Sequence, residues 1–68
     1  MKNKIEEIRK ERGILQDELA KNMGVSRQTI SSLENGRYNP SITLAYKIAK
    51  YFDMTIEDVF VFEEEDLK

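Results

Sequence analysis

Residues 16–37 read QDELAKNMGVSRQTISSLENGR, and this stretch decides the fold. Its apolar residues recur at the three- and four-residue intervals of two short helices on either side of a turn. Helices that cross steeply over such a turn need a small residue where their backbones approach, and a glycine where the chain turns left-handed. Ala20 and Gly24 meet these needs, and they are framed by Leu19, Met23, Val25, Ile30 and Leu33. The full set predicts two packed helices over residues 16–35.

The second of these helices has two unlike sides. At about 100° per residue, Ile30 and Leu33 share the side that faces the core. The opposite side carries Arg27, Gln28, Ser31 and Ser32. Exposed helices commonly carry Glu and Lys pairs, whereas Arg, Gln and Ser are side chains that hydrogen-bond to base edges. We therefore expect a helix-turn-helix whose second helix lies in the major groove of DNA; the alternative is a polar helix that is merely solvated.

Each of these outer side chains fits a particular contact with a base. Arg27 has the geometry to hold O6 and N7 of guanine, and Gln28 to pair with N6 and N7 of adenine. Ser31 and Ser32 add adaptable hydroxyl contacts.

Ser26 is expected to cap the second of these two helices, which should end near residue 35. Capping and helix-breaking residues indicate three further helices, the first of them over residues 3–12 and closed by Gly13. Pro40 breaks the chain, so Ser41 is expected to cap the next helix, and Thr55 to cap a short one over residues 55–58. The buried stripe of the helix after Ser41 is predicted to be Leu44, Ala45, Ile48, Ala49 and Phe52. The fold class is therefore all-α, with five helices.

Composition restricts the function. The 68 residues fit one domain with a modest core, and they include no cysteine or histidine for a disulfide or a usual zinc site. We expect no cofactor and no metal, and an enzyme is disfavoured because catalysis would rest on the carboxylates of residues 63–66, which have no pocket. No apolar run is long enough for a membrane span, so a cytoplasmic location is expected.

The charge is unevenly distributed. The formal charge is −2, which at first argues against a nucleic-acid partner. Residues 1–52 nevertheless hold ten basic and six acidic side chains, whereas residues 53–68 hold one basic and seven acidic. A basic body can face DNA if the acidic end points away; alternatively, both charged regions are simply solvated surface.

The motif as a whole resembles the Cro/CI-type (XRE) repressor family. The resemblance rests on residues 16–20 (QDELA), 24–37 (GVSRQTISSLENGR) and 39–41 (NPS), and it extends over about residues 3–60. It implies a five-helix, lambda-repressor-like bundle with a short C-terminal β-like extension. It also implies a homodimer on a near-palindromic operator, with double-stranded DNA as the partner, and the expected role is repression.

The resemblance also implies roles for single residues. Bases would be contacted by Arg27, Gln28, Ser31, Ser32 and Asn39. Phosphates would be contacted by Gln16, Ser26, Thr29, Asn35, Gly36, Arg37 and Tyr38, with Gln16 also supporting Gln28. Leu15 departs from the family, which usually has a hydroxyl cap there, and losing such a cap costs about 1 kcal/mol. Arg9 is expected to pair with Glu34 for a structural purpose.

The last residues suggest a dimer element. Val59, Phe60, Val61 and Phe62 alternate like a short strand and are too apolar to remain in water. We expect this segment to pair with residues 1–4 or with a second subunit; the alternative is a tail folded on its own bundle. The predicted division is therefore a DNA-binding domain over 1–60, with its helix-turn-helix at 16–35, and a dimerising tail over 61–68.

A second function stays open on the sequence alone. An antitoxin, or an accessory partner of a toxin, would bind a protein through its apolar tail and control its own synthesis through the same DNA-binding face.

Overall fold

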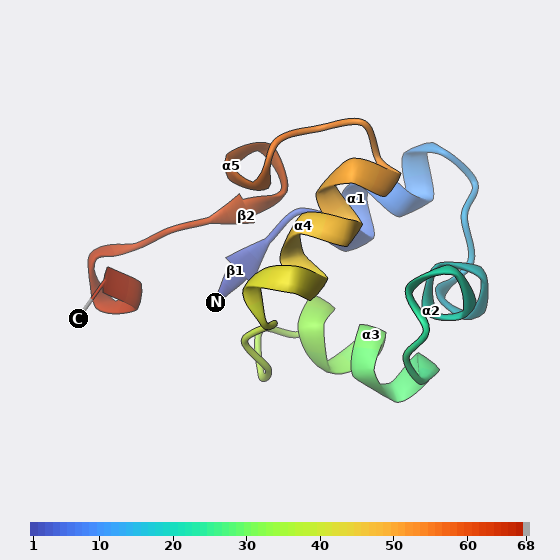
Figure 1. Ribbon diagram of the computed structural model, residues 1–68, viewed down its shortest axis with the longest axis horizontal. Helices are drawn as coiled ribbons and strands as arrows, with labels where there is room; N and C mark the ends of the chain where they lie inside the picture. Colours follow the sequence, from blue (N-terminus) through green and yellow to red (C-terminus); the bar gives the residue numbers. More distant parts are fainter. Residues whose placement is uncertain (68) are drawn as a thin grey trace.

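A computed structural model describes residues 1–67 (Figure 1). Within them the chain forms five α-helices and one two-stranded antiparallel sheet, which confirms the expected all-α fold with a small β extension. The elements in order are β1 (Lys2–Asn3), α1 (Ile5–Glu11), α2 (Gln16–Met23), α3 (Arg27–Glu34), α4 (Ile42–Tyr51), α5 (Ile56–Val59), β2 (Phe60–Val61) and the 3₁₀ turn η1 (Glu64–Leu67).

Every helix contributes to a single core. The predicted stripe from Leu44 to Phe52 is buried, and it packs on Ile5, Ile8, Leu19, Ala20, Met23, Ile30, Leu33, Val59 and Phe60. Fully burying a side chain of the Leu, Ile or Phe type contributes about 1.5–3 kcal/mol. The amphipathic periodicity of the sequence therefore translates directly into the packing of the bundle.

Side-chain caps begin the helices where the sequence predicts. Ser26, Ser41 and Thr55 each accept a hydrogen bond from the backbone N–H three residues later, at 3.1 Å. Asp58 completes a capping box by accepting the Thr55 N–H at 3.1 Å. Leu15 provides no side-chain cap to α2, as expected from its apolar side chain.

The N-terminal residues correct the expected start of the first helix. Asn3 does not begin a helix; Lys2 pairs with Val61 and Asn3 with Phe60 in the antiparallel sheet. The Asn3 amide donates to the Leu33 carbonyl at 2.7 Å, and its carbonyl oxygen accepts the Ile5 N–H at 3.1 Å. A tertiary contact with the end of α3 therefore holds Asn3 outside the helix, which begins at Ile5.

The end of the chain corrects part of the expected dimer element. Val59 closes α5 rather than starting a strand, and Val59 and Phe60 are both in the core of their own chain. The bundle of their own chain covers both side chains almost completely. Val61 and Phe62 are exposed, and the expected boundary after residue 60 falls inside strand β2.

A buried ion pair joins the start and the middle of the chain. The Arg9 Nε and Nη2 donate to the Glu34 carboxylate at 2.8 and 3.3 Å, as the family resemblance implies. The two side chains are only 8% and 3% exposed. Arg9 Nη1 also donates to the Ile14 carbonyl at 2.8 Å, and Gln16 Nε2 donates to Glu34 at 2.9 Å. One carboxylate thus ties α1 and the first residue of α2 to the last residue of α3.

Removing one partner of this pair is expected to destabilise the fold more than removing both. Arg9→Met leaves the Glu34 charge buried and unpaired, which typically costs about 3–5 kcal/mol. Arg9→Met combined with Glu34→Leu removes both charges and should lose less. Urea unfolding followed by circular dichroism measures both losses, and a double variant at least as unstable as the single one would contradict this account.

The capping box gives a defined pH dependence. Hydrogen bonds from the Thr55 backbone and hydroxyl, with the charge of Lys4, lower the pKa of Asp58 below its ordinary value of 3.8. The charged form is thus favoured in the folded state, so its contribution is complete above the unfolded pKa and is lost as pH falls through the lower folded pKa. The stability difference between the natural chain and Asp58→Asn should be steady near neutral pH and shrink below about pH 4. Thermal unfolding from pH 7 to pH 2.5 tests this, with Glu57→Gln as the charge-matched control; a difference that does not change with pH would contradict it.

Candidate nucleic-acid interface

The turn between α2 and α3 sets the direction of α3. Gly24 takes the left-handed conformation, with φ of 73°, and the Val25 N–H donates to the Ala20 carbonyl at 3.0 Å. Ala20 is buried, as expected for the small residue between the crossing helices. As a result α3 lies along one edge of the bundle with one long side free (Figure 1).

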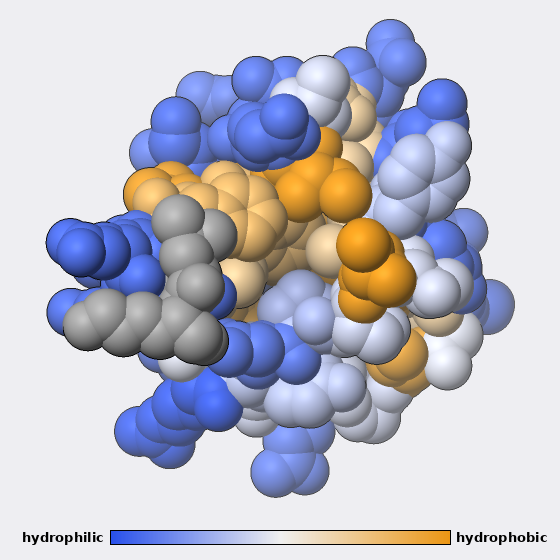
Figure 2. All heavy atoms as spheres, turned by 60° about the vertical axis from the view of Figure 1, so that its left-hand side comes forward, coloured by the Kyte–Doolittle hydropathy of each residue, from blue (hydrophilic) through white to orange (hydrophobic). Residues whose placement is uncertain are grey.

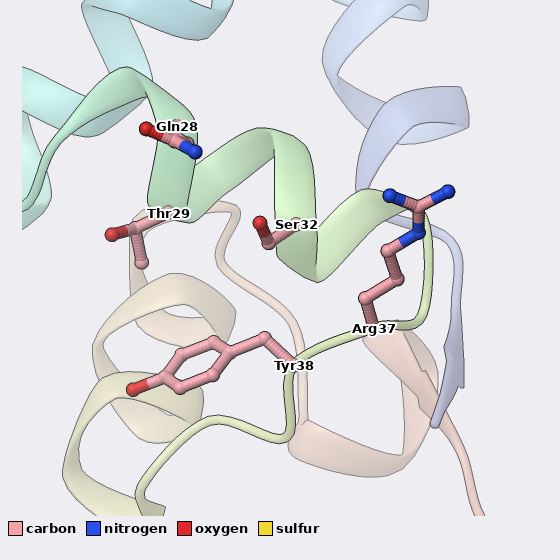
Figure 3. Close-up of a pocket in the computed structure, with 5 residues that line it drawn as sticks. All are labelled: Gln28, Thr29, Ser32, Arg37 and Tyr38. Atoms are coloured by element: carbon pink, nitrogen blue, oxygen red, sulfur yellow. The ribbon is translucent and has the colours of Figure 1, made fainter.

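A groove runs along one half of that free side. It has a volume of about 350 Å³, and it is lined by Gln28, Thr29 and Ser32 of α3 and by Arg37 and Tyr38 of the following loop. Figure 3 shows the three α3 side chains along one flank of the helix, with the Tyr38 ring across from them and Arg37 beside the end of the helix. The structure thus brings together two expected base contacts and three expected phosphate contacts.

The other half of the free side faces α2. Arg27 Nε donates to the Gln16 side-chain oxygen at 3.4 Å and lies 3.7 Å from the Asp17 carboxylate. The Gln16 amide joins Arg27 to Glu34, which are seven residues apart and therefore lie on the same side of α3. Its support of Gln28 on DNA, which the resemblance implies, stays a prediction. Ser31 is half-buried on the same half of the helix.

The two ends of α3 are held by backbone and hydroxyl contacts. The Ser26 and Thr29 hydroxyls lie 2.9 Å apart and share a hydrogen bond, so the cap also orients Thr29. Asn35 is the exposed C-cap, and Gly36 follows with a φ of 74°. The Arg37 N–H donates to the Ser32 carbonyl at 3.0 Å, which brings the loop back toward the helix.

Sequence reasoning missed two residues that position this loop. The Met1 amine donates to the Gly36 carbonyl and to the Asn39 side chain, both at 3.2 Å, and Asn3 binds the Leu33 carbonyl. Asn39 therefore contacts the N-terminus and is not among the residues that line the groove. No sequence signal could have found these contacts, since they join residues more than 29 positions apart.

The acidic residues near the end of the chain lie apart from α3. Strand β2 leads the acidic segment to the end of the molecule remote from α3 (Figure 1), so Glu63–Asp66 do not lie beside the free side of α3. Among residues 1–67 no group of acidic, histidine or cysteine side chains is arranged to hold a metal ion. The same residues include no helix long and apolar enough to cross a membrane.

Comparison with known proteins shows the same architecture in DNA-binding regulators. A helix-turn-helix family model matches residues 5–59. An HTH-type transcriptional regulator of Archaeoglobus fulgidus is 54% identical over 67 residues, which cover 98% of this chain and 96% of that protein. The N-terminal DNA-binding domain of SinR from Bacillus subtilis superposes with a TM-score of 0.72 at 33% identity, covering 88% of this chain and 87% of that one.

A structure of SinR in complex with DNA is also similar, with a TM-score of 0.69 at 35% identity over 78% of this chain and 86% of that one. The matched proteins have in common the two-helix motif and the bundle that supports it. The chain belongs to the helix-turn-helix family of the XRE type, and it is a DNA-binding transcriptional regulator.

Proposed function

We propose that this chain is a repressor that binds a near-palindromic operator as a homodimer, with α3 of each subunit in the major groove. One observation carries the proposal: the free side of α3 is polar along its whole length, and Tyr38 and Arg37 extend it with a groove. An α-helix fits the major groove, where each base pair presents a distinct set of donors and acceptors.

The base-reading residues are Arg27, Gln28, Ser31, Ser32 and Asn39. Gln28 is exposed on the free side near the start of α3 and is the best placed to pair with an adenine. Arg27 is held weakly at the α2 side, because its partner Asp17 is itself 74% exposed. It can therefore exchange this carboxylate for a guanine at the rim of the helix. Asn39 reads from the loop, at the edge of the recognised sequence.

The phosphate-binding residues are Gln16, Ser26, Thr29, Asn35, Gly36, Arg37 and Tyr38. Gln16 lies at the start of α2, and the others lie toward the two ends of α3 and in the loop after it, so the set flanks the base-reading residues. Contacts in such positions fix the register of the helix on DNA and carry no sequence information of their own. The groove beside Tyr38 is the place for one DNA strand.

Two-fold symmetry supplies the remaining specificity. Recognition helices that read successive major grooves on one side of DNA lie about 34 Å apart, one helical turn. The chain extends over 33 × 22 × 19 Å, a size of the same order as that spacing. Occupying an operator is sufficient to exclude another protein from the same DNA, which is why repression is the proposed outcome.

Gln28→Ala and Arg27→Ala are each expected to weaken binding to the preferred operator by about 1–3 kcal/mol, because each removes a bidentate contact with a base. Selection from random duplexes supplies that operator, and fluorescence anisotropy measures the binding. Lys10→Ala is the matched control, since Lys10 is exposed on α1 and pairs with Glu6 at 3.6 Å. Unchanged affinity in both α3 variants, with native circular dichroism, would rule out α3 as the reader.

Arg37→Ala is expected to act differently. It should weaken binding to all duplexes by a similar factor and lower the slope of log affinity against log salt by about 1, because one phosphate contact is lost. Titrations at four salt concentrations with operator and random DNA measure the slope. Loss of affinity for the operator alone would make Arg37 a base-reading residue instead.

A further inference from the structure

A Schellman motif closes α3 and begins the loop after it. Gly36 has a φ of 74°, and its N–H donates to the Leu33 carbonyl at 3.0 Å. The Arg37 N–H donates to the Ser32 carbonyl, also at 3.0 Å. These two hydrogen bonds fix the backbone from which the Arg37 side chain leaves the helix. The position of Arg37 therefore depends on how firmly the last carbonyls of α3 are held.

Asn3 holds one of these carbonyls from outside the helix. Its amide nitrogen donates to the Leu33 carbonyl at 2.7 Å and to the Met1 carbonyl at 3.4 Å. Its amide oxygen accepts the Ile5 N–H at 3.1 Å. A side-chain amide has two N–H donors, and both are used here. Turning the amide over would set oxygen against oxygen at Leu33, so only one orientation satisfies all of these contacts.

Asn3 is itself anchored to the core of the bundle. It pairs with Phe60 in the sheet, and Phe60 is only 1% exposed. The next residue, Lys4, donates its N–H to the Val59 carbonyl at 2.7 Å. Figure 1 shows β1 against β2 and close to the loop that follows α3. Strand β1 is therefore a firm support from which Asn3 reaches the end of α3.

The N-terminal segment and the loop after α3 also pack on each other. Met1, Pro40, Phe60 and Phe62 are among the residues that line a hollow of about 230 Å³. Figure 2 shows apolar residues gathered on this side of the molecule, with hydrophilic residues around them. A Cβ atom at Gly36 would lie 3.4 Å from the Met1 carbonyl oxygen, so the loop has little room to move toward the N-terminal segment.

We propose that Asn3 is a positioning residue for DNA binding, which holds the Leu33 carbonyl and thereby places Arg37 where its side chain reaches a phosphate. The inference rests on the proposed function, in which Arg37 binds phosphate, and it gives the β1–β2 sheet a part in DNA binding. Asn3 acts through Arg37 and not on DNA itself. Its effect belongs to the salt-dependent part of binding that phosphate contacts supply, which carries no sequence information.

The first test needs no DNA. Asn3→Ser keeps a hydroxyl for the local contact at the start of α1, but this side chain is too short to reach Leu33. Hydrogen exchange followed by NMR should show the Gly36 and Arg37 amides exchanging at least about five-fold faster in the variant. The Val25 amide, in the turn before α3, is the internal control and should exchange at an unchanged rate. Equal exchange of Gly36 and Arg37 in both proteins would overturn the role of Asn3.

The second test measures DNA binding by fluorescence anisotropy. Asn3→Ser should weaken binding to operator and random duplexes by a similar factor. Its fall in affinity between about 50 and 200 mM salt should be about three-fold smaller than that of the natural chain, the share of one phosphate contact. The preference at the base that Gln28 reads should not change. Thr55→Ala is the control for lost stability, because it removes the cap of α5 and should leave the salt dependence as it is.

A double-mutant cycle with Arg37→Ala separates positioning from a purely structural role. In the Arg37→Ala background, Asn3→Ser should change affinity by less than about two-fold, because the contact that Asn3 positions is already gone. The same loss of affinity in both backgrounds would show that Asn3 does not act through Arg37.

The outcomes separate this inference from the proposed function. If Arg37→Ala lowers the salt dependence and Asn3→Ser does not, the inference is overturned while the phosphate contact of Arg37 stands. If Arg37→Ala leaves the salt dependence unchanged, Arg37 does not bind phosphate, and that part of the proposed function falls together with the inference. A salt dependence that falls in both single variants, and no further in the double variant, supports both.

Discussion

The buried pair of Arg9 and Glu34 is the contact on which the arrangement of the first three helices depends. Glu34 ends α3, Arg9 comes from α1, and Gln16 begins α2, so the carboxylate is the point where all three meet. A charged group this deeply buried is tolerable only when it is paired in good geometry. The pair therefore specifies one arrangement of the helices more than it adds stability. Because it holds the end of α3, it also determines how α3 is presented.

The buried and the exposed side chains of α3 have different roles. Ile30 and Leu33 hold the helix to the core, and this leaves Gln28 and Ser32 free on the opposite side. The helix cap takes part as well, since the hydroxyl of Ser26 engages Thr29, a residue of the groove. The cap and the apolar contacts that stabilise α3 thus also leave its polar side chains on the outer side.

The two ends of the chain meet in the sheet. Strand β1 pairs with β2, while Asn3 and Met1 contact the end of α3 and the loop after it. The sheet therefore lies between the loop that borders the groove and the segment that carries Phe62 and the acidic residues. This arrangement places the acidic residues 63–66 away from α3 in a chain whose net charge is −2.

The sequence by itself determined the helix-turn-helix, the three serine and threonine caps, the left-handed turn at Gly24 and the buried stripe of α4, because all of these depend on local periodicity and backbone preference. The family resemblance supplied the pairing of Arg9 with Glu34. Only the tertiary structure decided that Asn3 joins a strand, that Gln16 serves Arg27, and that Phe60 is buried while Phe62 is not. The physical reason is distance along the chain: each of these outcomes depends on a partner that lies many residues away, and no local pattern records which partner the folded chain brings near.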